Sequence, residues 1–192
     1  MSPEQAALLR IFNLITLILG GVKSGKSREA ERLASNSQLD VTVLATARAD
    51  DAEMQNRIAM HQSSRPANWG LIEEPVAIGK ALQASCRSTA PQCVILDCLT
   101  LWMTQIIALP ESAFIAQRES LQEAMESVNG ELIIVSNESG LGVTPMGNLS
   151  RRYLDEIGLL HQDIAAKADR VLFMTAGLSQ QLKSPDILTQ RS

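Results

Sequence analysis

One segment of the sequence places a glycine-rich turn between an apolar run and a helix-forming stretch. Residues 20–27 read Gly-Gly-Val-Lys-Ser-Gly-Lys-Ser and fit the pattern G-x-x-x-x-G-K-[ST]. Glycines let such a loop curl so that its backbone N–H groups point at phosphate oxygens, and the helix that follows adds its positive N-terminal end. The segment therefore predicts a loop that binds nucleotide phosphates through these residues: Gly20, Gly21, Val22, Lys23, Ser24, Gly25, Lys26 and Ser27.

Two side chains of this loop and two acids elsewhere carry the expected chemistry. Lys26 is expected to reach the β- and γ-phosphates of a nucleoside triphosphate, and the Ser27 hydroxyl to ligate Mg²⁺. Asp97 ends an apolar strand, where it would hold Mg²⁺ through a water; the alternative is an acid that only caps the next helix. Glu138 follows a later strand, as a second acid, a water-positioning group or a structural residue.

The loop alone does not separate a kinase from a hydrolase or a nucleotide-dependent switch. No N-K-x-D sequence follows a late strand, which argues against a guanine site of the Ras type. The loop therefore predicts nucleotide binding, and residues outside the loop are needed to predict an activity.

Short β-rich runs alternate with helical stretches along the chain. Strands are predicted at 14–19, 41–45, 69–73, 93–97, 132–136 and 170–175, and helices at 24–34, 50–62, 76–87, 99–109, 111–128 and 149–168. This alternation predicts an α/β fold with a mostly parallel sheet, helices on both faces, and functional residues just after the strands. Residues 13–192 are interpreted as a single P-loop nucleotide-binding domain after a short extension, 1–12, and the polar tail from Gly177 is expected to be loose.

The composition of the chain argues against some classes of binding partner. The 192 residues carry a net charge of −4 and only 3% aromatic residues, which argues against a general nucleic-acid binder or a base-stacking module. The apolar run near the start is far shorter than the roughly 20 residues that span a bilayer, and no signal-peptide pattern accompanies it, so we expect a cytoplasmic protein without a membrane span. Three cysteines fit free thiols in a reducing compartment, and two histidines make a multi-histidine metal site improbable.

Several further motifs appear in a fixed order, and together they resemble one enzyme family. On the residues alone, His61 could be a nucleophile, an acid–base group or a phosphate ligand. The motifs are G-G-V-K-S-G-K-S at 20–27, D-x-E-M-x-x-R-I-x-x-H-x-x-x-R-P-x-x-W at 51–69, E-E-P at 73–75, D-C-L-T-L-W at 97–102, S-N-E-x-G-x-G-V-x-P at 136–145 and R-Y-x-D-x-x-G at 152–158. From about residue 17 to 183 the chain resembles the bifunctional adenosylcobinamide kinase / adenosylcobinamide-phosphate guanylyltransferase family of cobalamin biosynthesis.

The resemblance implies two reactions at one nucleotide site. The first phosphorylates adenosylcobinamide with ATP or GTP; the second transfers GMP from GTP to adenosylcobinamide phosphate through a covalent guanylyl-histidine, here His61, and releases pyrophosphate. It also implies GTP contacts, beyond the phosphate loop, from Thr46, Ala47, Arg48, Ser64, Arg65, Glu73 and Asp97. A RecA-like sheet with one antiparallel strand and a homotrimer are expected as well.

Some alternatives stay open at this stage. A P-loop kinase of another small molecule would use no covalent intermediate, and a non-enzymatic switch would show no turnover. His161 is expected on the surface of its helix, while Trp69 and Trp102 are expected to pack in the core or an interface rather than stack on a corrinoid. The general base of the kinase step, the preferred phosphoryl donor and the corrinoid contacts are not fixed by the residues.

Overall fold

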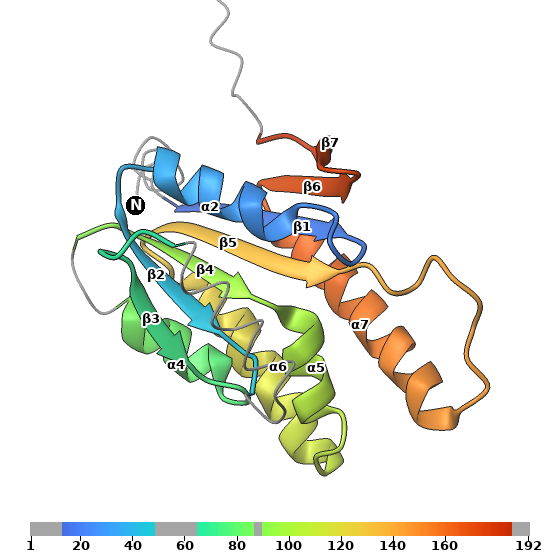
Figure 1. Ribbon diagram of the computed structural model, residues 1–192. Coiled ribbons are helices and arrows are strands. Elements are labelled where there is room, and N and C mark those ends of the chain that lie inside the picture. The colour runs from blue at the N-terminus through green and yellow to red at the C-terminus, as the bar shows by residue number, and fades with distance from the viewer. Residues whose placement is uncertain (1–12, 49–64, 87–89, 186–192) are drawn as a thin grey trace, which may run out of the picture.

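The computed structural model describes residues 13–48, 65–86 and 90–185, and these form a seven-stranded sheet with helices on both faces (Figure 1). Its strands are β1 (Asn13–Gly20), β2 (Asp40–Ala45), β3 (Gly70–Glu73), β4 (Gln92–Asp97), β5 (Gly130–Asn137), β6 (Arg170–Thr175) and β7 (Leu178–Lys183). The helices are α2 (Lys26–Asn36), α4 (Ile78–Ser85), α5 (Leu99–Ile106), α6 (Glu111–Glu126) and α7 (Asn148–Lys167). The predicted extension at 1–12 and the predicted helix at 50–62 lie outside the described residues.

The strand order is β3-β2-β4-β5-β1-β6-β7, and every neighbouring pair is parallel except β6 with β7. The central strands are the apolar runs of the sequence, and they are buried on both faces because helices cover both. Among the described helices, α2 packs on one face, where Ala30 and Ala34 join the smaller core. Helices α4, α5, α6 and α7 pack on the other face over the larger core. The expected α/β architecture with a mostly parallel sheet is confirmed.

Both tryptophans pack as expected from the sequence. Trp102 is fully buried in the larger core, and its indole Nε1 donates a hydrogen bond of 2.8 Å to the carbonyl oxygen of Val76. Trp69 is half-buried against the smaller core. None of the described helices is long and apolar enough to cross a membrane.

The C-terminal segment differs from its prediction. Instead of a loose tail from Gly177, residues 178–183 form β7, which pairs antiparallel with β6 at the edge of the sheet. All six residues of β7 are exposed, including its two leucines, so no buried side marks the strand, and backbone pairing with β6 holds it. The single antiparallel strand that the resemblance implies is therefore present.

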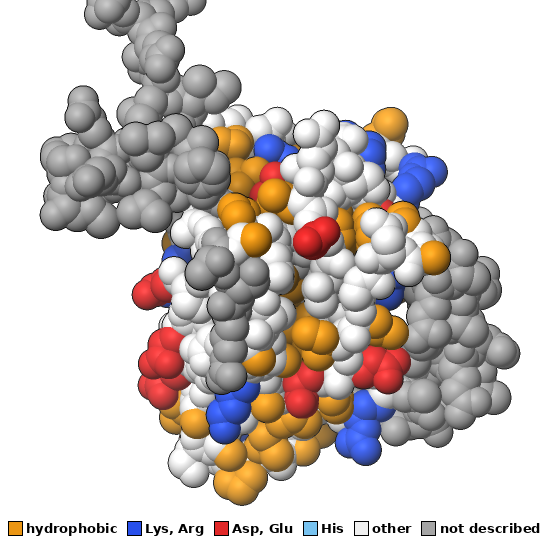
Figure 2. Space-filling model, turned by 90° about the vertical axis from the view of Figure 1, so that its left-hand side faces the viewer, with side chains coloured by type: hydrophobic (Ala, Val, Ile, Leu, Met, Phe, Trp, Pro, Cys, Tyr) orange, Lys and Arg blue, Asp and Glu red, His pale blue; other side chains and the backbone are white. Residues whose placement is uncertain are grey.

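Surface charge is mixed on the side of the molecule seen in Figure 2. Acidic and basic side chains alternate with apolar ones among the described residues, and no one sign of charge covers that face.

Candidate active site at the carboxyl edge of the sheet

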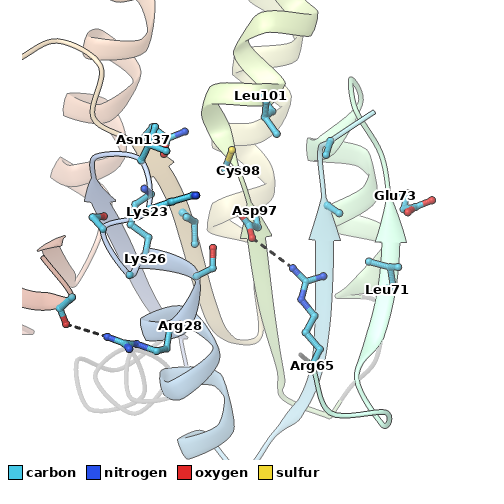
Figure 3. Close-up of a pocket in the computed structure, with 18 of the residues that line it drawn as sticks. Lys23, Lys26, Arg28, Arg65, Leu71, Glu73, Asp97, Cys98, Leu101 and Asn137 are labelled. Carbon is cyan, nitrogen blue, oxygen red and sulfur yellow. Dashed lines mark hydrogen bonds and ion pairs between the residues drawn. The ribbon is translucent and has the colours of Figure 1, made fainter. Parts of the chain in front are cut away.

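A cavity of about 720 Å³ lies at the carboxyl ends of the parallel strands, where ligands bind in open α/β sheets. It runs across the sheet from β3 to the β6–β7 turn, with the phosphate loop on one side and Leu71 and Glu73 on the other (Figure 3). The cavity is lined by Val22, Lys23, Ser24, Gly25, Lys26, Ser27, Arg28, Ala45, Ala47, Arg65, Leu71, Glu73, Asp97, Cys98, Leu101, Val135, Asn137, Ala176 and Gly177.

The phosphate loop joins β1 to α2, and the sheet fixes its first residue. Gly20 has a φ of 150°, and a Cβ there would lie 2.4 Å from the carbonyl oxygen of Met174 on neighbouring β6. Only glycine fits this close approach of two backbones. The loop is also tied to the β6–β7 turn, because Gly177 N–H donates to the Ser24 carbonyl over 3.0 Å and Arg28 donates to the Gly177 carbonyl over 3.4 Å.

Lys26 is a buried cation at the floor of the cavity. Its Nζ donates a 2.6 Å hydrogen bond to the Gly21 carbonyl, which holds the ammonium inside the curl of the loop. Burial lowers the pKa of Lys26, while the nearby Cys98 and Asp97 raise it to a smaller extent. An anionic phosphate at this position would offset the burial of the ammonium and favour its charged form.

Asp97 and Arg65 both line the cavity and lie close to each other. The Arg65 Nη2 lies 3.6 Å from the Asp97 carboxylate, and its Nε lies 3.8 Å from Glu31 on α2 (Figure 3). Arg65 Nε and Ser24 Oγ are buried and have no hydrogen-bond partner in the part of the chain that the structure describes. Because both side chains line the cavity, an anionic ligand would supply the partners that they lack.

The donors of the cavity suit Mg²⁺ bound together with a nucleotide. The Ser27 hydroxyl and the Asp97 carboxylate both line it, and oxygen donors of this kind are the ligands that Mg²⁺ prefers. Residues 13–48, 65–86 and 90–185 contain no group of three or more His, Cys, Asp or Glu side chains that could hold a metal by themselves. These residues therefore suit a metal ion that takes its remaining ligands from phosphate oxygens and water.

A buried polar network supports the cavity wall behind Asp97. The Thr46 hydroxyl accepts a hydrogen bond from the Cys98 N–H (2.9 Å) and donates one to the Cys98 carbonyl (2.7 Å). Thr100 Oγ1 lies 3.1 Å from the Cys98 thiol and accepts a 2.9 Å hydrogen bond from Asn137 Nδ2. Burial is the main cause that raises the pKa of Cys98, so this thiol stays neutral beside Lys26.

His161 is buried, which contradicts its predicted place on the helix surface. Only 7% of it is exposed, its Nε2 lies 2.7 Å from Ser136 Oγ, and its Nδ1 lies 4.0 Å from the Glu138 carboxylate. Burial lowers the pKa of His161, and Glu138 offsets part of that effect. The residue faces the sheet because it lies four residues after Ile157 and three before Ile164, on the buried side of α7.

The structure brings most of the predicted site residues together, and leaves some apart. Lining the cavity are Val22, Lys23, Ser24, Gly25, Lys26, Ser27, Ala47, Arg65, Glu73 and Asp97. Gly20 and Gly21 shape the loop without lining the cavity, Thr46 is buried with its hydroxyl engaged by Cys98, and exposed Arg48 does not line it. The candidate nucleophile His61 and the contact residue Ser64 lie outside the described residues.

Sequence reasoning did not name several cavity residues as site residues. Asn137 follows a strand, which is the signal that could have found it, and Arg28 directly follows the phosphate loop. Leu71 and Leu101 resemble ordinary apolar positions in the sequence. Ala176–Gly177 reaches the cavity only because β6 pairs with β1, a relation that no local pattern reveals.

Comparisons with known proteins place the chain in a family. The family described as cobinamide kinase / cobinamide phosphate guanyltransferase matches residues 16–182. The chain belongs to this family. Its members are bifunctional enzymes, and the resemblance inferred from the motifs is confirmed.

Curated relatives agree with this family over nearly their whole length. The bifunctional adenosylcobalamin biosynthesis protein CobP of Pseudomonas aeruginosa is 50% identical over 168 residues, covering 87% of this chain and 96% of CobP. CobU of Escherichia coli is 29% identical, and CobU of Salmonella typhimurium is 30% identical, each across 88% of this chain and 100% of CobU.

A solved structure independently supports the fold. An ATPase from the type III secretion system of pathogenic bacteria superimposes with a TM-score of 0.54 at 12% sequence identity. The match covers 88% of this chain and 58% of the ATPase, so this family member spans little more than half of that protein's length. The RecA-like P-loop fold is thereby confirmed, and identity this low carries no statement about activity.

Proposed function

We propose that this protein phosphorylates adenosylcobinamide and then converts the phosphate to adenosylcobinamide-GDP. ATP or GTP supplies the phosphoryl group in the first reaction, and GTP supplies GMP in the second. The observation that carries the proposal is the cavity that combines the phosphate loop, Asp97 and Arg65 in a chain of this family. The family description names both activities, the relatives' names call them bifunctional, and the cavity offers one site for the nucleotide of both reactions.

The nucleotide is proposed to lie along the cavity with its terminal phosphates in the phosphate loop. Backbone N–H groups of residues 20–27 and the N-terminus of α2 would bind the phosphate oxygens, and Lys26 would neutralise their charge. Mg²⁺, held by Ser27 and through a water by Asp97, would supply further charge neutralisation when bound. Glu73 and Leu71 at the other end leave room for the base and ribose.

His61 is proposed as the nucleophile of the second reaction. An imidazole nitrogen of His61 attacks the α-phosphorus of GTP, a P–N bond forms, and the bond from the α-phosphorus to the bridging oxygen breaks to release pyrophosphate. A phosphate oxygen of adenosylcobinamide phosphate then attacks the same phosphorus and displaces the imidazole. Arg65, four residues after His61 in the sequence, lines the cavity, and this supports the proposal that His61 acts on a nucleotide bound there.

A cytoplasmic homotrimer is proposed for the assembled enzyme. The loop between β5 and α7 exposes three large apolar side chains, with Leu141 81%, Val143 96% and Met146 94% exposed. A contact between subunits would remove such surface from water. The corrinoid substrate is proposed to bind where subunits meet, because the cavity of about 720 Å³ at the phosphate loop is assigned to the nucleotide.

A labelling experiment tests the covalent step. The protein is incubated with Mg²⁺ and GTP carrying ³²P on the α-phosphate, and acid-labile, base-stable label on the protein is counted after denaturation. Wild type and His161→Gln should both become labelled, while His61→Ala should not; these are the only two histidines of the chain, so the pair is matched.

The label should leave the protein when adenosylcobinamide phosphate is added and appear in adenosylcobinamide-GDP. Equal labelling of wild type and His61→Ala would refute the histidine intermediate. Phosphorylation of adenosylcobinamide without any protein label would instead indicate a simple P-loop kinase.

A further inference from the structure

Asn137 occupies a position that the order of strands makes special. Strand β5 lies between β4, which ends in Asp97, and β1, which leads into the phosphate loop. In the register of the sheet, Asn137 is paired with Gly20, the first residue of the loop, while Asp97 pairs with Val135 on the same strand. The side chain of Asn137 therefore lies at the carboxyl edge between the two groups that are expected to hold the phosphates and the metal.

The side chain of Asn137 faces the cavity. It lines the cavity together with Lys26 and Asp97, and Figure 3 shows it above Lys23 of the phosphate loop, with Cys98 to its right. An asparagine amide has two N–H donors and one carbonyl acceptor. One N–H is used by Thr100 Oγ1 at 2.9 Å, so the second N–H is available to a ligand in the cavity.

The surrounding residues hold this amide in place. Thr100, its partner, is itself buried beside the Cys98 thiol at the start of α5. On either side of Asn137, Ser136 contacts the buried His161 and the Glu138 N–H donates to the Gly20 carbonyl over 3.0 Å. A polar group whose orientation is fixed in this way before the ligand arrives can stabilise a charged group with little reorganisation.

We propose that Asn137 is a phosphate-binding residue, which donates its free amide N–H to the terminal phosphate of the bound nucleoside triphosphate. This inference rests on the proposed function, because it assumes that a triphosphate lies in the phosphate loop. Because a diphosphate lacks the terminal phosphate, this donor would favour a bound triphosphate over a diphosphate. Asn137 also holds its donor ready for the phosphoryl group while this group is transferred, and for pyrophosphate as it leaves.

Nucleotide affinities measured by calorimetry test the proposal. With Mg²⁺ present, wild type, Asn137→Ala and Asn137→Asp are titrated with GDP and with a non-hydrolysable GTP analogue. A hydrogen bond to a charged group predicts a loss of about 10- to 100-fold in affinity for the triphosphate in Asn137→Ala, with GDP affinity unchanged within about 3-fold. Asn137→Asp keeps the size of the side chain but replaces the donor by a carboxylate, and should lose more.

Two controls separate a phosphate contact from a structural role. Asn148→Ala removes an exposed asparagine at the first residue of α7, and should leave both affinities unchanged. Thr100→Val removes the partner that orients the amide but keeps the amide itself, so its loss of triphosphate affinity should be smaller than that of Asn137→Ala.

Equal changes in GDP and triphosphate affinity, or no change in either, would overturn the proposal for Asn137. That result is distinct from failure of the proposed function, in which wild type itself would bind neither nucleotide or turn over neither substrate. If wild type phosphorylates adenosylcobinamide and Asn137→Ala does so at an undiminished rate, the inference about Asn137 alone is wrong.

Discussion

Replacing His161 by Gln should make the folded protein less sensitive to acid. Burial lowers the pKa of His161 in the folded state, whereas in the unfolded chain it lies near 6.5. The unfolded chain therefore takes up the proton first, so wild type loses stability as the pH falls below about 6.5 and until it reaches the lowered pKa of the folded state. Since each pH unit in this window is worth about 1.4 kcal/mol, moving from pH 7.5 to 5.5 should cost wild type up to about 1.4 kcal/mol through this residue.

Urea denaturation at the two pH values measures the effect. Gln keeps a nitrogen or oxygen near the position of Nε2, so the contact with Ser136 Oγ survives while the titrating group is removed. Between pH 7.5 and 5.5 the urea midpoint of wild type should fall by about 0.5 M more than that of His161→Gln, for a denaturant slope of about 2.5 kcal/mol/M. Equal midpoint shifts in both proteins would refute the reasoning, because they would mean that Glu138 restores the pKa that burial lowers.

Two further substitutions test the packing of the sheet and the core. Gly130→Ala should lower the free energy of unfolding by about 2–4 kcal/mol, because Gly130 has a φ of 122° and a Cβ there would lie 2.1 Å from the Gln92 carbonyl oxygen. Urea denaturation measures this loss. A loss below about 1 kcal/mol would contradict the pairing of Gly130 with Gln92 in the sheet. Trp102→Phe should cost about 3 kcal/mol, because it removes the hydrogen bond to the carbonyl of half-buried Val76 and opens a cavity in the core, while nucleotide affinity should be unchanged. Trp69→Phe is the matched control, and a cost equal to that of Trp102→Phe would argue against a special role for the buried indole.

The central sheet could be predicted from the sequence because its strands are apolar on both faces. Residues 14–19 and 93–97 are examples: β1 is one residue longer at each end than its predicted range, and β4 begins one residue earlier than predicted. Strand β7 could not, because it is an exposed edge strand held by backbone pairing with β6, and its two apolar residues, Leu178 and Leu182, are not buried. The surface position predicted for His161 is wrong although its spacing from Ile157 and Ile164 is that of the buried side of α7, because a histidine in a sequence usually indicates contact with water.

In the candidate site, too, some residues can be predicted from the local sequence and others only from the arrangement of the sheet. The phosphate loop is contiguous, so its composition and spacing are visible in eight residues, and Asp97 is visible as an acid at a strand end. The contribution of Asn137 depends on β5 lying between β4 and β1, which is a property of the sheet and not of any segment. The confirmed resemblance supplied what spacing could not: a family, and through it the hypothesis about His61.

The hydrogen bonds between the phosphate loop and the β6–β7 turn have a consequence for biosynthesis. Arg28 and Gly177 are separated by 149 positions in the chain, so the loop is made early on the ribosome and its partner very late. A nascent chain can form β1 and α2 long before the turn emerges, yet the wall formed by Ala176 and Gly177 is then still missing. Nucleotide binding is thus expected to begin only after the last hairpin has been translated.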